Sequence, residues 1–296
     1  MRFMYQYPEV HGSEDDLRDA GPVPEVARAA EEAGFEGISF TEHPIPGARW
    51  LDAGGHQTLD PFIALAASAG ATNRIRLLTC LAVAPYRNPF LLAKTAASLD
   101  IVSGGRFILG LGTGYHKTEF FALGVDFDER NALFDEALEV LPLHWRGEPF
   151  SYEGRHFNAR DVIARPRPIQ DPIPIWIGGN AQVTRRRVAD HAQGWMPLLG
   201  SETLNQTTRT PSLGGREGIA AAMKEIRDRG AARGEFDLLY PYAEPISVTD
   251  DPARHRDAIA EIEEMGATWA CILGHTTTRD STLAFLEWFG ANVIAP

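Results

Sequence analysis

A glycine-rich stretch is the part of this chain best suited to binding a cofactor. The apolar run Arg106–Leu111 has the pattern of a buried strand and leads into Gly110, Gly112 and Gly114 at alternate positions. Alternate glycines leave room for a flat or anionic group near the backbone and permit positive φ angles. A simple bend of the strand beside a helix is the alternative. The spacing is not that of a Rossmann turn, so its meaning depends on the surrounding fold.

His43 and a second glycine turn are further candidates for chemistry. His43 follows an expected strand beside a long loop, and imidazole exchanges protons near neutral pH, although a loop histidine can also serve a backbone carbonyl. Gly178–Asn180 leads from a strand into a helix, where free N–H groups and the helix dipole suit a phosphate. The run Arg185–Arg187 comes next, and one of these arginines could reach an anionic tail, although such a run is more often a solvated face.

Composition and missing motifs exclude several classes of protein. The hydrophobic fraction of 44% and charged fraction of 23% are ordinary for a globular protein, and the net charge of −12 argues against a nucleic-acid surface. Cys80 and Cys271 have no neighbours at metal-ligand spacing, so no metal site is expected. The motifs of serine hydrolases, zinc proteases and Walker nucleotide-binding loops are missing. With no signal peptide or membrane span evident, we expect a cytoplasmic protein without a membrane partner.

Strand-like and helix-like segments alternate along the chain, which predicts parallel βαβ units. The expected strands are Arg2–Tyr7, Gly37–Glu42, Ile75–Val83, Arg106–Gly112, Ile173–Gly178, Gly194–Leu199, Asp237–Ile246 and Ala270–Gly274. The expected helices are Val23–Phe35, Asp60–Thr72, Pro89–Val102, Arg130–Trp145, Ala181–His191, Glu217–Arg233, Pro252–Met265 and Ser281–Phe289. With no composition break in 296 residues, the pattern predicts one domain, a single (β/α)8 TIM barrel of the α/β class, over a doubly wound sheet.

Three segments are longer than the connections that a minimal barrel needs. Pro44–Leu59 follows the second strand, Ser201–Gly215 follows the sixth, and Gly147–Pro172 follows the fourth helix and predicts a hairpin. Long loops in a compact domain are commonly lids or binding loops. Because active sites of such barrels lie at the carboxyl ends of the strands, Gly112–Tyr115 and Thr41–Pro44 are expected to face the same mouth as the first two insertions.

A series of motifs, taken in order, resembles the bacterial luciferase-like oxidoreductases, most closely the branch that uses the deazaflavin coenzyme F420. The motifs are Thr41–Pro44, Tyr86–Pro89, Ser103–Phe107, Gly110–Tyr115, Glu136–Leu141, Trp145, Tyr152–Phe157, Arg165–Pro168 and Ile175–Asn180. The resemblance is strong over residues 20–200 and looser elsewhere. It implies a barrel that holds the coenzyme ring over the third strand.

The resemblance also implies roles for individual residues. The family commonly has a non-prolyl cis peptide behind the ring, and the matching bond is Cys80–Leu81. Glu42 and His43 match an acidic-histidine pair at the ring's reactive edge, so His43 would exchange the proton that accompanies hydride transfer and Glu42 would contact the ring. The remaining matches for the ring or its tail and phosphate are Thr113, Gly114, Thr118, Gly179, Asn180, Ala181 and Thr184.

Two departures narrow the expected chemistry. Thr113 stands where bacterial luciferase has an arginine for the FMN phosphate, which favours a deazaflavin. Tyr115 stands where F420-dependent sugar-phosphate dehydrogenases carry a glutamate, which argues against a sugar phosphate. Trp50, Tyr115 and Trp195 are candidate substrate contacts, although burial in the core is the commoner fate of a residue like Trp195.

The activity implied is hydride transfer between F420 and a small, partly apolar organic substrate, in a homodimer. An FMN-dependent monooxygenase of the same fold is one alternative. A flavin-binding protein without turnover is another, because a barrel can retain a ring site and lose its chemistry.

Overall fold

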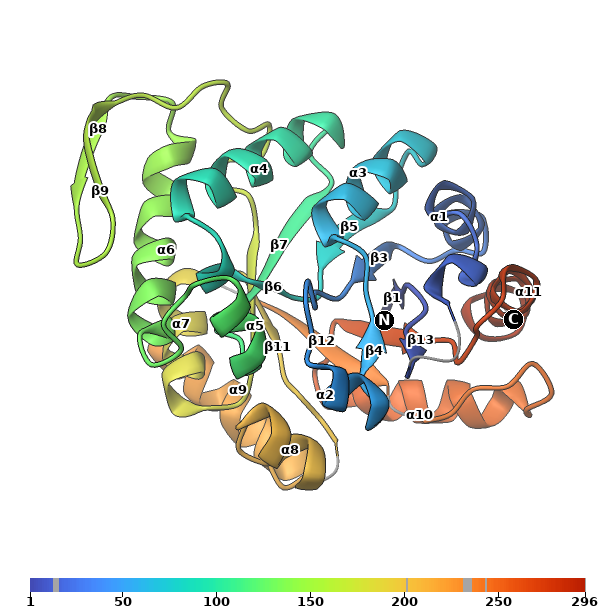
Figure 1. Ribbon diagram of the computed structural model, residues 1–296. Helices are drawn as coiled ribbons and strands as arrows, with labels where there is room; N and C mark the ends of the chain where they lie inside the picture. Colours follow the sequence, from blue (N-terminus) through green and yellow to red (C-terminus); the bar gives the residue numbers. More distant parts are fainter. Residues whose placement is uncertain (13–15, 201, 231–235, 243, 296) are drawn as a thin grey trace.

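Eight parallel strands close into a barrel with helices around it (Figure 1). The computed structural model describes residues 1–12, 16–200, 202–230, 236–242 and 244–295. The barrel strands, in order around the ring, are β1 Arg2–Gln6, β3 Gly37–Phe40, β5 Arg76–Thr79, β7 Phe107–Gly112, β10 Ile175–Gly178, β11 Gly194–Met196, β12 Asp237–Tyr242 and β13 Trp269–Leu273. Pairing of β13 with β1 closes the ring. The predicted (β/α)8 barrel is confirmed.

One principal helix follows each barrel strand. They are α1 Val23–Glu32, α3 Pro61–Ala71, α4 Pro89–Val102, α6 Arg130–Trp145, α7 Gln182–His191, α9 Arg216–Gly230, α10 Pro252–Glu264 and α11 Arg279–Phe289. Asp60 and Asn88 cap α3 and α4 by accepting backbone N–H groups, each before a proline in the first turn. The last residues of the helix expected at 217–233, together with Ser201 and Ala243 of two other expected segments, lie outside the described residues.

The core has an outer layer between the sheet and the helices and a smaller cluster inside the barrel. Every residue of β3 and β7 is buried, as expected for parallel strands covered on both faces. The inner cluster consists of Met4, Leu78, Ile108, Trp176, Met196, Leu239 and Trp269. The barrel is therefore filled with side chains, and its binding surfaces must lie at its ends.

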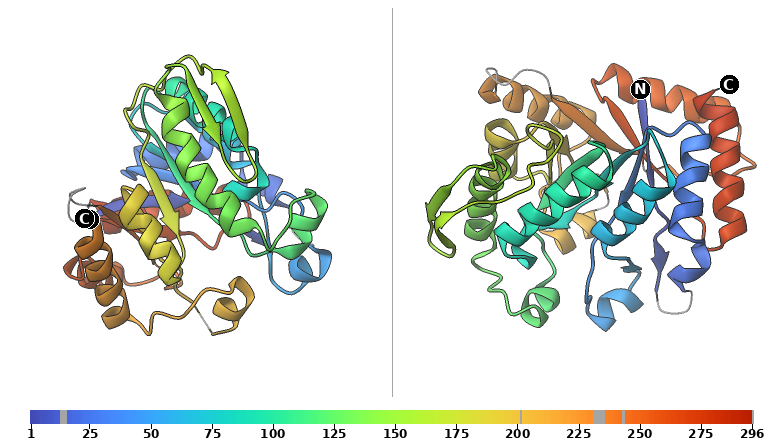
Figure 2. Two further views of the ribbon diagram at one scale, coloured as in Figure 1. Left: turned by 90° about the vertical axis from the view of Figure 1, so that its left-hand side faces the viewer. Right: turned by 90° about the horizontal axis from the view of Figure 1, so that it is seen from above.

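Short elements extend the loops at the carboxyl ends of the strands. They are β2 Val10–His11, η1 Leu17–Ala20, α2 Ala48–Asp52, β4 His56–Gln57, β6 Ala82–Val83, η2 Ala84–Tyr86, α5 Lys117–Ala122 and α8 Glu202–Thr208, with η4 Gly290–Ile294 closing the chain. Figure 2 shows α2 and α5 beyond the same end of the barrel. The insertion after α6 forms the expected hairpin, β8 Phe150–Glu153 and β9 Asn158–Val162, which lies outside the barrel beside α6.

The third strand differs from the prediction. Ile75–Val83 was expected as one strand, but pairing stops after Thr79 and resumes at Ala82, in β6. The interruption is the Cys80–Leu81 peptide, which is cis as the family resemblance implied. The uninterrupted strand was therefore wrong, and the break places Leu81 beside the strands that carry the glycines.

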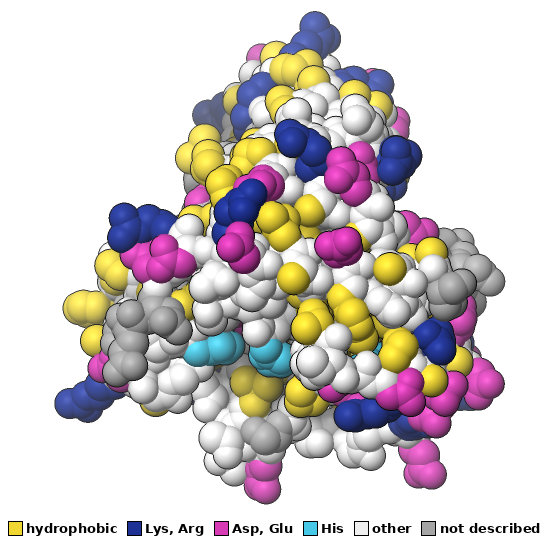
Figure 3. All heavy atoms as spheres, turned by 90° about the vertical axis from the view of Figure 1, so that its right-hand side faces the viewer, with side chains coloured by type: hydrophobic (Ala, Val, Ile, Leu, Met, Phe, Trp, Pro, Cys, Tyr) yellow, Lys and Arg dark blue, Asp and Glu magenta, His cyan; other side chains and the backbone are white. Residues whose placement is uncertain are grey.

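The outer surface carries mixed charges. On the face in Figure 3, basic and acidic side chains are interspersed. Within the described ranges, no helix is long and apolar enough to cross a membrane.

Candidate active site at the carboxyl end of the barrel

A buried carboxylate holds His43. The Nδ1 atom of His43 lies 3.2 Å from Oε2 of Glu119, whose side chain is completely buried, and the Tyr86 hydroxyl donates to the same oxygen at 2.8 Å. A carboxylate only accepts hydrogen bonds, so Nδ1 carries the proton of the neutral ring and Nε2 is left with a lone pair. Thr58 fixes the backbone by accepting the His43 N–H at 2.9 Å. His43 is thus positioned to exchange a proton at Nε2.

Aromatic side chains enclose the imidazole of His43. The Tyr115 hydroxyl lies 3.4 Å from Nε2, and the Trp50 ring is centred 4.5 Å from the imidazole. Burial, and then the charges of Glu119 and Glu9, raise the pKa of Tyr115, so its hydroxyl stays protonated and can donate. The wall beside Nε2 therefore combines an apolar surface with one hydroxyl.

A second acid and histidine lie beside the first pair. His56 Nε2 is 3.6 Å from Glu9 Oε1, and the His56 ring is centred 5.1 Å from that of His43. Burial raises the pKa of Glu9, while burial together with His43 and His11 lowers the pKa of His56 to about 3. Both pKa shifts favour the neutral forms of these two groups.

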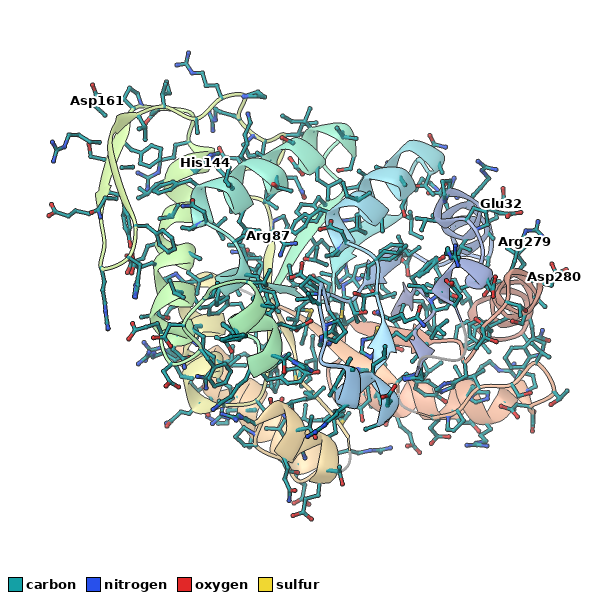
Figure 4. The ribbon with its side chains drawn as sticks, viewed as in Figure 1. Glu32, Arg87, His144, Asp161, Arg279 and Asp280 are labelled. Carbon is teal, nitrogen blue, oxygen red and sulfur yellow. The ribbon has the colours of Figure 1, made fainter. Side chains whose placement is uncertain are left out.

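Glu42 is engaged within the protein. Its carboxylate accepts the Val83 N–H at 2.7 Å and forms an ion pair with Arg87. Arg87 also lies 3.3 Å from Asp60 and over the ring of Phe62, and Figure 4 labels it near the centre of the view. Glu42 therefore fixes β6 immediately after the cis peptide.

The three glycines of β7 and its turn have different surroundings. A Cβ at Gly110 would lie 1.9 Å from the Thr79 carbonyl oxygen, and one at Gly112 would lie 2.5 Å from the Leu81 side chain. These two glycines permit close packing against β5 and Leu81. Gly114, with φ +76°, lines a pocket, so of the three it is the one whose position suits the cofactor role first considered.

That pocket, of about 140 Å³, lies between β7, the turn after β10 and the segment after α8. Its lining includes Thr113, Gly114, Tyr115, Gly179, Asn180, Ala181, Thr184, Arg130, Arg187 and Arg209. The turn precedes α7, whose first N–H groups are available to an anion. The volume suits a phosphate-sized group more than a complete ring system, since drug-sized ligands occupy roughly 300–1,000 Å³. Backbone, hydroxyl and guanidinium groups together fit an anionic tail.

Side chains around this turn are partly committed to the fold. The Asn180 side-chain amide donates hydrogen bonds to the carbonyl oxygens of Leu198 and Pro211 and accepts one from the Leu198 N–H. It therefore connects the turn to the loop after β11. Arg185 pairs with Glu225, and Arg187 with Asp135. These two arginines of the run are therefore held by carboxylates.

Two residues that were expected to contact the substrate or the coenzyme do not line the pocket. Trp195 is fully buried, and its indole N–H donates to Gly179 at 2.9 Å. It has no face open to a substrate, so the expectation of direct stacking is corrected: Trp195 packs in the core and supports the glycine turn. Thr118 is exposed on α5, next to Gly47, and is not part of the pocket lining.

Sequence reasoning missed Glu9, His56, Glu119, Arg130 and Arg209. Glu9 lies just after β1, and barrel topology alone places it at the same mouth as His43. Glu119 follows Tyr115 by four residues, but its role depends on α5, which was expected as loop. Arg130 and Arg209 required the tertiary fold. Among the described residues, no group of three or more possible ligands is arranged to hold a metal ion.

Comparison with known proteins identifies the family. The model of the luciferase-like monooxygenases matches residues 1–264. The chain belongs to this family. An uncharacterized protein of Mycobacterium tuberculosis is 30% identical over 86% of this chain and 96% of its own length. An F420-dependent glucose-6-phosphate dehydrogenase of Microbacterium testaceum is 29% identical over 81% of this chain and 66% of its own length.

Solved structures of the luciferase-like fold include users of both coenzymes. A monooxygenase, RslO1 from Streptomyces bottropensis, has a TM-score of 0.82 at 22% identity, covering 99% of both chains. An F420-dependent secondary alcohol dehydrogenase has a TM-score of 0.75 at 17% identity, covering 99% of this chain and 98% of its own. A type II Baeyer-Villiger monooxygenase from Pseudomonas putida, bound to FMN, has a TM-score of 0.68 at 14% identity, covering 96% and 98%. At these identities the likeness shows the shared fold.

Proposed function

We propose that this member of the luciferase-like family is an F420-dependent oxidoreductase acting on a small, partly apolar organic substrate. The observation that carries the proposal is His43, held by Glu119 so that Nε2 faces Tyr115 at the barrel mouth. Support comes also from the similarity to an F420-dependent dehydrogenase along 81% of the chain. When bound, the coenzyme would accept or donate the hydride at C5.

In the mechanism we propose, His43 manages the proton at a substrate oxygen. In the oxidation direction, Nε2 takes the hydroxyl proton as the hydride leaves the adjacent carbon. In the reverse direction, protonated Nε2 returns it to the carbonyl oxygen. Glu119 accepts from Nδ1–H throughout and favours the cationic ring once it forms. The protonated Tyr115 hydroxyl is placed to donate to the same substrate oxygen.

The coenzyme would be held at several places. The backbone of Gly179–Ala181, with Thr113, Gly114 and Thr184, would bind the phosphate, and the segment containing Cys80 and Leu81 would support the ring. Glu42 would act through Val83 and Arg87. The substrate would lie against Trp50 and Tyr115, beneath the loops after β3 and β11. The homodimer expected from the family resemblance stays a prediction.

An FMN-dependent monooxygenase is the second candidate, and one observation favours it. Thr113 leaves no arginine at the position that serves FMN in luciferase, yet Arg130 and Arg209 reach the same pocket from other elements. A phosphate there would not lack cationic partners. Thr113 alone therefore disfavours FMN less strongly than the sequence indicated.

Titration with each reduced coenzyme separates the two candidates. We expect F420 to bind with a micromolar Kd and FMN at least about tenfold more weakly, a difference of about 1.4 kcal/mol. Tighter binding of FMN, together with substrate-dependent oxygen consumption, would replace the proposal with the monooxygenase. A bound coenzyme that never exchanges electrons with any donor or substrate would indicate the non-catalytic alternative.

His43→Ala tests the proton role. Loss of a general acid–base group lowers kcat/KM by about 10²–10⁴, whereas F420 affinity should change little. His191→Ala is the matched control, because His191 is an exposed histidine in the last turn of α7. Unchanged turnover of the His43 variant would remove the histidine from the mechanism.

A further inference from the structure

Three cations surround one aromatic ring beside the phosphate-sized pocket. The Phe127 ring is centred 5.1 Å from Lys117 Nζ, 3.9 Å from the Arg130 guanidinium and 5.0 Å from that of Arg209. Lys117 begins α5, Arg130 begins α6, and Arg209 follows α8. Three separate segments therefore contribute to one group, Lys117, Phe127, Arg130 and Arg209, which we name the Phe127 cluster.

The Phe127 cluster is held in place by the fold. Phe127 packs edge-on against the fully buried Phe120, with ring centres 5.1 Å apart. Arg130 donates to the Phe127 carbonyl oxygen at 2.8 Å. Arg209 has φ +54°, a left-handed conformation that is uncommon for a residue other than glycine and recurs at ligand-binding positions.

Charges of the Phe127 cluster are largely uncompensated within the protein. Burial and the neighbouring Arg209 both lower the pKa of Arg130, with Asp128 opposing them. Of the ion pairs formed in the described parts of the chain, none involves Lys117, Arg130 or Arg209. The protein as a whole has a net charge of −12, so a group of three cations without ion-pair partners has the opposite charge to the protein as a whole. Such a group attracts an anion with more than one charge.

The position of the Phe127 cluster relates it to the pocket. Arg130 and Arg209 line the pocket together with Gly114 and Gly179, whereas Lys117 lies outside that lining. A ligand phosphate in the pocket would thus lie beside Arg130 and Arg209, which also contact Phe127. FMN ends at its phosphate. The deazaflavin coenzyme continues into a lactyl group and a chain of glutamates, with additional carboxylates.

We propose that Lys117, Arg130 and Arg209 bind the carboxylate tail of the deazaflavin coenzyme beyond its phosphate. This inference rests on the proposed function. Each carboxylate would meet a cation already held against Phe127, so less side-chain freedom is lost on binding than at a mobile surface lysine. The cluster then favours long-tailed coenzyme over a tail-less form.

The experiment compares two coenzyme forms, one without glutamates and one with a long oligoglutamate tail, by quenching of deazaflavin fluorescence. We expect the long-tailed form to bind about tenfold more tightly at low ionic strength, as summed exposed charge pairs allow. The preference should disappear at high salt, since exposed charges are screened. Inorganic phosphate should compete with both forms, which separates phosphate binding from tail binding.

Lys117→Gln combined with Arg209→Gln should reduce the tail preference to about twofold or less. Lys224→Gln, on the exposed face of α9, is the matched control and should keep the full preference. Thermal melting of each variant verifies folding. Equal affinity for both forms in the unaltered protein, or a preference that survives the double substitution, would overturn the inference. Failure of every deazaflavin to bind would overturn the proposed function as well, which is a distinguishable result.

Discussion

The two ends of the barrel differ in what their polar groups do. The amino end has the larger cavity, of about 550 Å³, yet its charged side chains mostly serve the fold. Arg2 pairs with Asp237, and Glu31 accepts the backbone N–H groups of Asn73, Arg74 and Ile75. The carboxyl end has a pocket of about 140 Å³, and beside it lies an imidazole nitrogen facing a hydroxyl. Cavity size alone would therefore point away from His43 and the phosphate-sized pocket.

Unpartnered atoms occur at both ends, so the difference lies in their chemistry. At the amino end, Arg76 Nε and Trp269 Nε1 have no hydrogen-bond partner, and both are groups that only donate. At the carboxyl end, the buried His56 Nε2 and His116 Nδ1 have no hydrogen-bond partner, and imidazole nitrogens can either give or take a proton. Of these four atoms, only the two at the carboxyl end can therefore exchange protons.

After replacement of His43 itself, the largest expected effect comes from breaking the contact that orients His43. Glu119→Gln should lower kcat by about 10- to 100-fold, because the neutral amide no longer favours the imidazolium. KM and coenzyme affinity should stay within about twofold, since the loss falls on the chemical step. Steady-state kinetics and coenzyme titration measure these values. A rise in KM with unchanged kcat would indicate a role in binding instead.

Tyr86→Phe is the control for Glu119. It removes the other partner of Oε2 and leaves the contact with His43 in place. We expect kcat to fall by about fivefold or less, because the net contribution of one hydrogen bond is about 1 kcal/mol.

The next effect, at the amino end, concerns stability without chemistry. Glu31→Ala should lower the free energy of unfolding by about 2 kcal/mol, because the buried N–H of Ile75 loses its acceptor while water reaches those of the exposed Asn73 and Arg74. Urea unfolding measures this change. Coenzyme affinity of the folded protein should not change. If the free energy of coenzyme binding changed as much as the free energy of unfolding, the functional distinction between the two ends would be wrong.

Glu31 also makes the amino end sensitive to acid. Burial raises the pKa of Glu31. The backbone N–H groups of Arg74, Ile75 and Asn73 together outweigh burial, so the pKa lies below the ordinary value of 4.5. A lowered pKa in the folded state contributes stability above pH 4.5, and this contribution is lost as the pH falls through the folded-state pKa. Unfolding of the protein and of Glu31→Gln should therefore differ at pH 7 and converge in acid. A constant difference across this range would contradict the assignment.

The smallest effect is expected at the outer rim of the molecule, on exposed ion pairs at the starts of α1 and α11. Arg279 contacts Asp280 and Glu25 at the edge of the molecule, where Figure 4 labels Arg279 and Asp280. Exposed ion pairs contribute little to stability. Arg279→Ala should leave both melting temperature and coenzyme affinity unchanged, as differential scanning fluorimetry and titration would show.

The regular elements were predictable where local chemistry defines them. Helices Pro89–Val102 and Arg130–Trp145 have the predicted bounds, and the first begins at an Asn-Pro cap that can be recognised from sequence alone. The strand predicted at Ile75–Val83 was too long because the apolar pattern of the sequence continues through the cis peptide. The geometry of a peptide bond does not alter the hydrophobicity of the residues that it joins. Helices α2, α5 and α8 are short, and in the sequence they look like loops.

The candidate site was predictable to the extent that it follows strand ends. His43, Gly114 and Gly179 lie at the barrel mouth as expected, because topology alone places them there. The partners of His43 and of the pocket could not be found in this way. The positions of Glu119 and Arg209 depend on how irregular segments fold back over the barrel mouth. Such packing produces no periodic pattern of hydrophobic residues that could be recognised in the sequence.

The most direct test of the account is a crystal structure of the protein with the deazaflavin coenzyme bound. We predict electron density for the ring beside Leu81 and His43, with the phosphate in the turn formed by Gly179 and Ala181 at the carboxyl end. Coenzyme density in the amino-end cavity, or a phosphate away from this turn, would contradict the assignment of the two ends.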